Sequence, residues 1–346
     1  MFIYVEVVLV FLTIGLLGKT LSISPPDEFS VLETLSHLIS NRSSHLPWIP
    51  SIAYETKPMD EYQQRQFIKD QKYESQIELI LAELQAYLLS TTEAQEFFKR
   101  ATAYGLPSSD NLKFYENFIL SYDNRYKQPV WALEHLTQRL FNRTVIRHSR
   151  RSKFYDDMTL HEYFRAGHLD YWKCFFDRGQ FAPACDNKIK QKFFDRSYLY
   201  SNTAPRTTTI NREKCVWDRL ESYVAFLAWR TRNVYAVTGA LHKPNKNNRN
   251  LRYRVIGRNR IAVPTHYYKV LLYQDNNGHL LLEAYAVPNS MQIKVYEGLE
   301  QFRVNAEDLD NLEGLTGLRF FNLLDKSSII KPTRLQYGFR EKLREV

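Results

Sequence analysis

The chain has 346 residues with a formal net charge of +9, and 44% of the residues are hydrophobic. This composition excludes collagen-like and wholly disordered chains, and the length allows one large domain with an appendage, or two domains. Residues 1–101 hold 8 Lys and Arg against 13 Asp and Glu, whereas residues 102–346 hold 39 against 25, a net of +14. A basic body behind an acidic leader suits a polyanionic partner such as nucleic acid, and a solvated basic surface is the alternative.

The N-terminus carries an apolar run over residues 2–17, followed by Lys19. The run is short for a spanning helix of about 20 residues, and no basic residue precedes it as in a signal peptide. We interpret residues 1–19 as a membrane-directing or targeting segment. Residues 20–58 contain five prolines and Ser-rich patches, which predict an irregular linker.

Apolar residues recur at spacings of three and four between residues 73 and 88 and predict one long amphipathic helix over residues 59–89. Ser90-Thr-Thr-Glu93 is a capping box that predicts a second helix over residues 91–103. This helical arm, residues 59–103, carries no chemical motif. We expect it to pack on the body or on a partner and to be dispensable for folding of the body.

From residue 102 the pattern changes to short β-rich runs between turns. Strands are predicted at 118–122, 129–133, 233–238, 253–257, 267–273 and 280–287, the first two as a hairpin. A helix over residues 211–230 precedes the last four strands. The predicted class is α+β, with a body built around a mostly antiparallel sheet.

The three cysteines, Cys174, Cys185 and Cys215, cannot pair fully with one another. Their spacing lacks the paired Cys-x-x-Cys of a structural zinc site, so we expect buried thiols. A link between Cys174 and Cys185 is the alternative in an oxidising compartment. Asn41 and Asn142 begin glycosylation sequons, which matter only if the chain is secreted.

The stretch Asp177-Arg-Gly-Gln-Phe-Ala-Pro-Ala184 resembles the Asp-Arg-Gly-His signature of the DNA/RNA non-specific ββα-metal endonucleases. Further stretches resemble the endonuclease G branch of that superfamily, in the same order along the chain: Tyr104-Gly-Leu-Pro107, Leu120-Ser-Tyr-Asp123, Tyr198-Leu-Tyr-Ser-Asn202, Ala204-Pro205, Leu220-Glu221, Val255-Ile-Gly257, Ala262-Val-Pro-Thr-His266 and Pro288-Asn289. The resemblance implies a ββα-metal nuclease fold over residues 104–325, with residues 326–346 as a C-terminal tail.

The resemblance also implies an activity, the hydrolysis of phosphodiester bonds in DNA and RNA with Mg²⁺ or Mn²⁺ as cofactor. Asn211 matches the metal ligand and Arg178 matches the arginine that neutralises the phosphate. Glu221 matches the helix glutamate that orients metal-bound water. Asn202 and Arg206 match positions that support this site or contact nucleic acid, although Arg206 stands where the family usually has Gln.

Two departures from the family pattern bear on the activity. Gln180 stands at the position of the general-base histidine, and a carboxamide cannot accept the proton of the attacking water. The resemblance therefore implies reduced activity, and the alternative is an inactive pseudonuclease that binds nucleic acid or dimerises. Two residues are also inserted between Asn211 and Trp217. Inside a helix they would turn Glu221 by about 200°; in a loop they would bring Glu213 toward the metal.

Each site residue also has a plain structural interpretation. Arg178 could form an ion pair with Asp177, and Asn211 could be a helix N-cap. Glu221 could be an exposed helix residue that pairs with a nearby Lys or Arg. The candidate replacement bases are His161, His266 and His168. We expect structural hydrogen-bonding roles for His161 and His266. Alternating lysines are expected to line a basic face: Lys188, Lys190 and Lys192.

Relatives of this type form homodimers in mitochondria, between the membranes. The resemblance therefore implies a homodimer in the intermembrane space or at the inner membrane, with membrane association through residues 1–19. Secretion is the alternative, given the two sequons.

Overall fold

The structure is a computed structural model that describes residues 92–332 apart from 143–152, 212–214, 245–249, 276, 294–297, 306–307, 326 and 328. The predicted targeting segment, the linker, the helix at 59–89, the Asn41 sequon, Glu213 and most of the C-terminal tail lie outside the described residues. No helix within the described ranges is long and apolar enough to cross a membrane.

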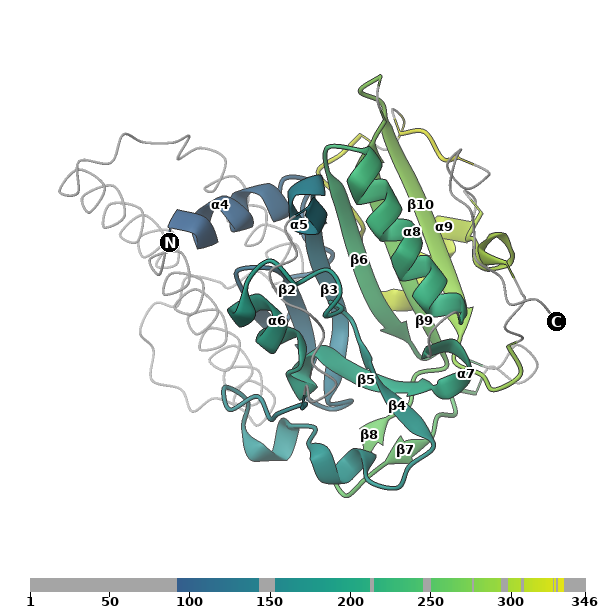
Figure 1. The fold of residues 1–346 in the computed structure, drawn as a ribbon. Helices are drawn as coiled ribbons and strands as arrows, with labels where there is room; N and C mark the ends of the chain where they lie inside the picture. Colours follow the sequence, from purple (N-terminus) through teal and green to yellow (C-terminus); the bar gives the residue numbers. More distant parts are fainter. Residues whose placement is uncertain are drawn as a thin grey trace, which may run out of the picture. The chain divides into compact units, whose positions relative to one another are not determined.

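A six-stranded antiparallel sheet forms the centre of the body (Figure 1). Its strands lie in the order β1 (Leu112–Phe114), β2 (Ile119–Asp123), β3 (Gln128–Leu136), β6 (Val234–Leu241), β9 (His266–Gln274) and β10 (Leu280–Pro288). The central strands are buried along almost their whole length, which is why they read as apolar runs in the sequence. The predicted hairpin and the predicted α+β class are confirmed.

The strand predicted at 253–257 is shorter than predicted and does not belong to the large sheet. Only Val255–Ile256 (β7) is extended, and it pairs with β8 (Ile261–Ala262) in a separate two-stranded sheet. Exposed arginines lie before the first strand and between the two strands, at Arg252, Arg254, Arg258 and Arg260. Asp170 anchors the hairpin, because its carboxylate accepts hydrogen bonds from Asn259 N (2.8 Å) and Asn259 Nδ2 (3.0 Å).

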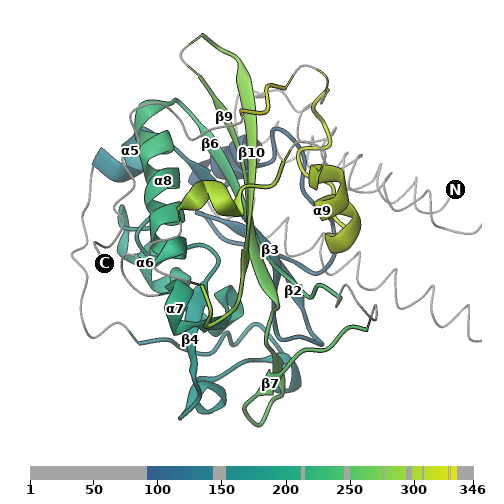
Figure 2. The same ribbon diagram turned by 90° about the vertical axis from the view of Figure 1, so that its right-hand side faces the viewer.

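Helices cover both faces of the large sheet. Helix α8 (Val216–Arg230) lies on one face and α9 (Asp308–Thr316) on the other (Figure 2). The apolar side chains of α8 that face the core recur at spacings of three and four: Trp217, Leu220, Tyr223, Val224 and Leu227. The helix predicted over 211–230 is in fact two helices, because α7 (Thr208–Asn211) ends before α8 begins. Asn211 and Glu221 therefore belong to two different helices, and α8 begins after its N-cap residue Cys215.

Helix α4 (Thr92–Ala101) falls within the second predicted helix, but it belongs to the body. Phe98 is fully buried and its ring meets that of Phe114 edge-on, with centroids 5.9 Å apart. Ala94 and Ala101 are buried beside it. The packing of α4 argues against the expected dispensability of this part of the arm.

A second, smaller unit carries the signature motif. Strand β4 (Phe176–Gln180) pairs antiparallel with β5 (Thr203–Thr207), and α7 follows β5 directly (Figure 1). Helix α6 (Gln191–Ser197) and the 3-10 turn η3 (Tyr200–Asn202) connect the two strands. The short helix α5 (Gln138–Asn142) and three further 3-10 turns complete the described elements: η1 (Glu162–Phe164), η2 (His168–Tyr171) and η4 (Leu299–Phe302).

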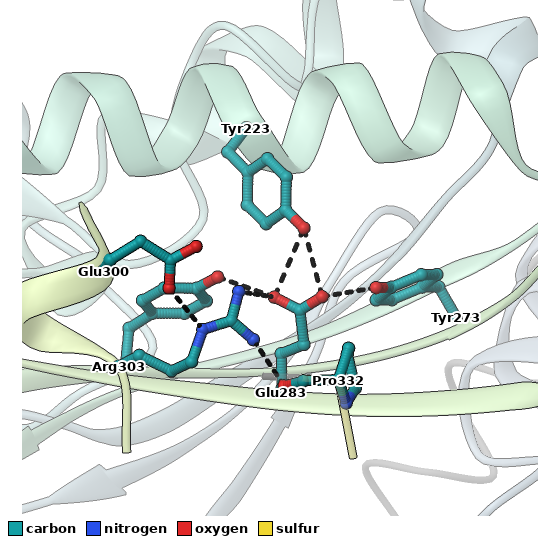
Figure 3. Close-up of polar contacts among 7 residues, drawn as sticks. Tyr223, Tyr273, Glu283, Glu300, Arg303 and Pro332 are labelled. Atoms are coloured by element: carbon teal, nitrogen blue, oxygen red, sulfur yellow. Dashed lines mark hydrogen bonds and ion pairs between the residues drawn. The ribbon is translucent and has the colours of Figure 1, made fainter. Parts of the chain in front are cut away.

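A buried carboxylate ties α8 to the sheet and to the segment after η4 (Figure 3). The Glu283 carboxylate, on β10, accepts hydrogen bonds from three tyrosine hydroxyls, those of Tyr223, Tyr273 and Tyr285. It also pairs with Arg303 at 3.2 Å, and Arg303 donates to the carbonyl of Pro332 at 2.8 Å. Because one carboxylate joins a helix, two strands and a later segment, we assign this cluster to folding and not to chemistry.

The cysteines differ from the expectation of buried thiols. The cysteines are not all buried residues, since Cys185 is exposed, Cys174 is half-buried and only Cys215 is buried; all three thiols are free. The lysines beyond the motif are exposed or half-buried, which fits the expected basic face, but two of them also form ion pairs. Lys190 pairs with Glu93 of α4, and Lys192 pairs with Glu116. These ion pairs join α6 to α4 and to the turn between β1 and β2.

Candidate active site

The β4–β5 pair places the signature beside the segment Thr203–Thr207. Asp177 lies opposite Arg206, and Gln180 lies opposite Thr203. Gly179, between them, leaves room for the Arg206 side chain: a Cβ at position 179 would lie 2.5 Å from Arg206 Nε. The glycine of the motif is therefore required by the close approach of a side chain from the neighbouring strand.

Arg178 lies among aromatic rings. The centroids of three rings lie 5.4–5.8 Å from its guanidinium carbon: Phe154, Tyr171 and Tyr200. Its Nε also donates to the Tyr200 hydroxyl at 3.2 Å. No ion pair joins Arg178 to Asp177, both of which the structure describes, so the interpretation as a simple Asp177 partner is wrong. The rings hold the guanidinium in place while leaving it half-buried, as a phosphate-neutralising group requires.

Both ends of the Gln180 carboxamide are engaged. Its Nε2 donates to the carbonyl of Ser197 at 2.7 Å, and its Oε1 accepts from the backbone N–H of Ala184 at 3.1 Å. The side chain thus braces the turn after β4 against the end of α6. A carboxamide has no nitrogen that takes up a proton near neutral pH, so Gln180 cannot accept one from water.

Asn202 is fully buried and bonds only to the backbone. Its Oδ1 accepts from Ala182 N at 3.0 Å, and its Nδ2 donates to Ala182 O and Ser197 O at 2.8 and 2.9 Å. This geometry places Asn202 as a brace beneath the site. Direct contact of Asn202 with nucleic acid does not fit its burial.

Arg206 is the most consequential side chain of the site. It is only 2% exposed, and its Nη1 donates to Asn211 Oδ1 at 3.0 Å. Its Nη2 donates to the carbonyl of Gln180 at 2.9 Å. Its guanidinium carbon lies 4.5 Å from the ring centroids of both Trp217 and Tyr267. The sequence placed Arg206 near the site but did not indicate that it reaches Asn211.

Asn211 ends α7, and Cys215 is the N-cap residue of α8. The interpretation of Asn211 as the N-cap of that helix is therefore wrong. Its Nδ2 lies 3.5 Å from Asp177 Oδ2, so the amide joins the end of α7 to β4 as well as to Arg206.

Glu221 is not an exposed helix residue. The indole N–H of Trp217 donates to its carboxylate at 2.8 Å. Burial raises the pKa of Glu221, and the positive charges of Arg206 and Lys269 oppose that rise. Glu221 therefore faces the same interior as Arg206, despite the insertion before α8.

Three buried charged residues surround Glu221, and this cluster was not identified from the sequence. Lys269 on β9, Glu134 on β3 and Asp186 are each 2% exposed or less. Burial raises the pKa values of both Glu134 and Asp186, and the charge of Lys269 opposes this. A lysine in the middle of the apolar run 267–273 was the available signal, because a fully buried lysine requires compensating charge.

The three candidate replacement bases do not reach Gln180 or Arg178 by any hydrogen bond among the described residues. His161 Nδ1 accepts from Tyr163 N at 3.3 Å and caps η1, and His266 contacts the Thr265 hydroxyl at 3.0 Å. His168 is exposed at the start of η2, with its ring beside that of Trp172. The hydrogen-bonding roles expected for His161 and His266 are confirmed.

The residues around Asn211 do not fit a divalent cation. Mg²⁺ requires oxygen ligands, and the amide oxygen of Asn211 already accepts from the cationic guanidinium of Arg206. A dication on that oxygen would meet a fixed positive charge. Within the part of the chain that the structure describes, no group of three or more His, Cys, Asp or Glu is arranged to hold a metal.

The DNA/RNA non-specific endonuclease family matches residues 99–327, and the chain belongs to that family. Its members typically depend on Mg²⁺. The chain is 32% identical to mitochondrial endonuclease G of Caenorhabditis elegans over 261 residues, which cover 74% of this chain and 82% of the relative. It is 34% identical to mitochondrial endonuclease G of Homo sapiens over 231 residues, covering 66% and 75%.

A second group of relatives is named nuclease EXOG. The mitochondrial protein of Danio rerio is 35% identical over 233 residues, which cover 65% of each chain. Among solved structures, the crystal structure of an EndoG/EndoGI complex matches with a TM-score of 0.62 and 31% identity, covering 70% of this chain and 96% of that chain. The fold is therefore that of endonuclease G.

Proposed function

We propose that this protein is a pseudonuclease of its family, which binds DNA and RNA at the β4–β5–α7 unit without hydrolysing their phosphodiester bonds at an appreciable rate. The observation that carries the proposal is the Gln180 side chain. Its carboxamide bonds to Ser197 and Ala184 and offers no basic nitrogen at the position where the family resemblance calls for the general base.

The binding half of the proposal is supported by a surface next to the site. Arg254, Arg258 and Arg260 are exposed on the β7–β8 hairpin, which Asp170 holds against η2. The segment around η2 exposes apolar side chains beside them, with Leu169 at 74%, Trp172 at 59% and Phe175 at 82%. Arginines that contact phosphates and aromatic rings that stack on bases are the two elements of sequence-tolerant nucleic-acid binding.

The alternative is a slow endonuclease in which another group accepts the proton. Arg178 favours it, because a half-buried guanidinium held by three rings can still neutralise charge on a phosphate. His168 is then the first candidate base to mutate.

The test uses the full-length chain in two assays, duplex and single-stranded nucleic-acid binding, and Mg²⁺-dependent nicking of plasmid DNA. We expect salt-sensitive binding and little or no nicking. Efficient nicking with a rate plateau near neutral pH would refute the pseudonuclease assignment, and so would undetectable binding at low salt. Gln180→His is assayed beside the natural chain, and Gln301→His, at an exposed position on η4, is its matched control for the effect of adding a histidine.

We further propose, from the mitochondrial names of the relatives, that the chain is directed to mitochondria by residues 1–19. From the motif resemblance alone, we also propose that it forms a homodimer. Fractionation of cells expressing the C-terminally tagged chain tests the compartment. A mobility shift on deglycosylation would instead indicate secretion through the sequons at Asn41 and Asn142. Sedimentation of the purified chain tests the dimer, and partition with vesicles tests membrane association.

A further inference from the structure

We infer that Arg206 is a built-in cation that closes the metal position at Asn211, so that this chain keeps its site assembled without a divalent ion. The inference rests on the proposed function only in taking the β4–β5–α7 unit as the nucleic-acid site. It concerns what occupies that unit, and it can be tested without nucleic acid.

The first step is the hydrogen bonding of the guanidinium. One terminal nitrogen of Arg206 donates to Asn211 Oδ1 at 3.0 Å, and the other donates to the Gln180 carbonyl at 2.9 Å. The guanidinium thus joins the end of α7 to the end of β4. The link between these two elements is therefore made by a cationic side chain.

The second step is the environment that keeps a buried cation in place. The planar guanidinium lies 4.5 Å from the ring centroids of Trp217 and Tyr267, where the negative faces of the rings attract it. Glu221 supplies negative charge from α8. Arginine does not lose its proton in proteins, so burial cannot neutralise the group. The positive charge is therefore permanent, and its surroundings are arranged for it.

The third step is the room made for the side chain. Gly179 has no Cβ, and any Cβ there would clash with Arg206 Nε at 2.5 Å. Arg206 Nε is itself buried without a hydrogen-bond partner. Gly179 thus lets the arginine cross β4 and reach Asn211, where each of its two terminal nitrogens makes a hydrogen bond.

The consequence is a site that does not take up divalent ions. A dication at Asn211 Oδ1 would lie beside the guanidinium in a buried region, where repulsion between like charges is much stronger than in water. Replacing Arg206 by a shorter, uncharged residue removes the repulsion and frees the oxygen. Arg206→Gln is therefore expected to create a divalent-ion site that the natural chain lacks.

The experiment measures Mn²⁺ binding to the full-length protein by calorimetry and by the electron paramagnetic resonance of free Mn²⁺. We expect no stoichiometric binding by the natural chain. Arg206→Gln should bind Mn²⁺ at least about tenfold more tightly, and adding Asn211→Ala should abolish the gain. Arg206→Lys, which keeps the charge, is the matched control and should resemble the natural chain.

Two outcomes would overturn the inference. One is stoichiometric Mn²⁺ binding by the natural chain that Asn211→Ala abolishes. The other is a folded Arg206→Gln variant that binds Mn²⁺ no better than the natural chain. If Arg206→Gln does not fold, the comparison of the natural chain with Asn211→Ala still decides. Because these measurements use no nucleic acid, they can overturn this inference while the proposed function stands. The nicking and binding assays can likewise overturn the proposed function while this inference stands.

Discussion

The side-chain amide of Gln180 and the carbonyl of Ser197 are joined by a hydrogen bond of 2.7 Å, and Asn202 donates to the same carbonyl at 2.9 Å. This shared acceptor fixes the orientation of Gln180, because its nitrogen is directed to Ser197 and its oxygen to Ala184 N. The group at the expected general-base position therefore has a structural role in this chain.

The first prediction concerns restoring hydrolysis. Gln180→His supplies a base, but Arg206 still closes the cation position, so the single variant should gain little. The double variant Gln180→His/Arg206→Gln should nick plasmid DNA with Mg²⁺ at least about a hundredfold faster than Arg206→Gln alone, a typical general-base contribution. Nicking rates between pH 6 and pH 9 measure this.

The pH profile separates the remaining explanations. A new base should give the double variant a histidine-like plateau, whereas any residual rate of the natural chain should climb steadily with pH. A natural rate equal to that of the double variant would show that another residue serves as base. Inactivity of all variants despite Mn²⁺ binding by Arg206→Gln would locate the defect outside these two positions.

The second prediction concerns the nucleic-acid surface. Arg258→Ala with Arg260→Ala should weaken DNA and RNA binding alike, and should reduce the slope of log Kd against log salt by about one for each phosphate that an arginine no longer neutralises. Trp172→Ala should weaken single-strand binding more than duplex binding, because stacking needs unpaired bases. Fluorescence anisotropy over a salt series measures both effects. Arg319→Ala, exposed just after α9, is the control and should leave the slope unchanged.

The third prediction concerns α4. Phe98→Ala removes a fully buried ring that packs against Phe114, and should lower the free energy of unfolding by about 3–5 kcal/mol. Glu96→Ala, on the exposed side of the same helix, should change it by about 0.5 kcal/mol or less. Urea unfolding of the full chain compares the two. Equal small effects would restore the view of α4 as a dispensable appendage.

The sequence predicted the large sheet well because its strands are buried on both faces and read as apolar runs. The same rule could not find β4, since Phe176-Asp-Arg-Gly-Gln180 has neither an apolar run nor a clean alternation. Strand β4 is stabilised by its pairing with β5, and Gly179 leaves room for the Arg206 side chain to pass across it. The end of α7 at Asn211 was equally hidden, because no Pro or Gly marks the break before α8.

The site was predicted in part for a related reason. Motif resemblance placed Arg178, Gln180, Asn202, Arg206, Asn211 and Glu221 in one unit, and the structure joins most of them through Arg206, Trp217 and Ser197. Which donor meets which acceptor depends on side-chain directions that spacing does not encode. The hydrogen bond between Arg206 and Asn211 is therefore visible only in the fold.

The last prediction concerns stability in acid. Burial lowers the pKa of both His242 and His266 to about 4. An unfolded histidine titrates near about 6.5, so between these values the unfolded chain binds more protons than the folded one. Stability contributed by each neutral histidine is therefore present above about pH 6.5 and is lost as the pH falls toward 4. Allowing for partial exposure, the loss is about 1–2 kcal/mol for each histidine.

Buried carboxyls act in the opposite direction, since burial raises the pKa values of Glu221 and Glu283 and makes their folded forms bind protons more readily as the pH falls. The histidine effect must therefore be read as a difference between variants. His266→Gln cannot take up a proton and still offers a group that can bond the Thr265 hydroxyl. Between pH 7 and pH 4.5, the free energy of unfolding should fall by about 1–2 kcal/mol more in the natural chain than in His266→Gln. The exposed variant His168→Gln should follow the natural chain. Parallel losses in all three proteins, measured by urea unfolding, would show that the acid sensitivity does not arise from His266.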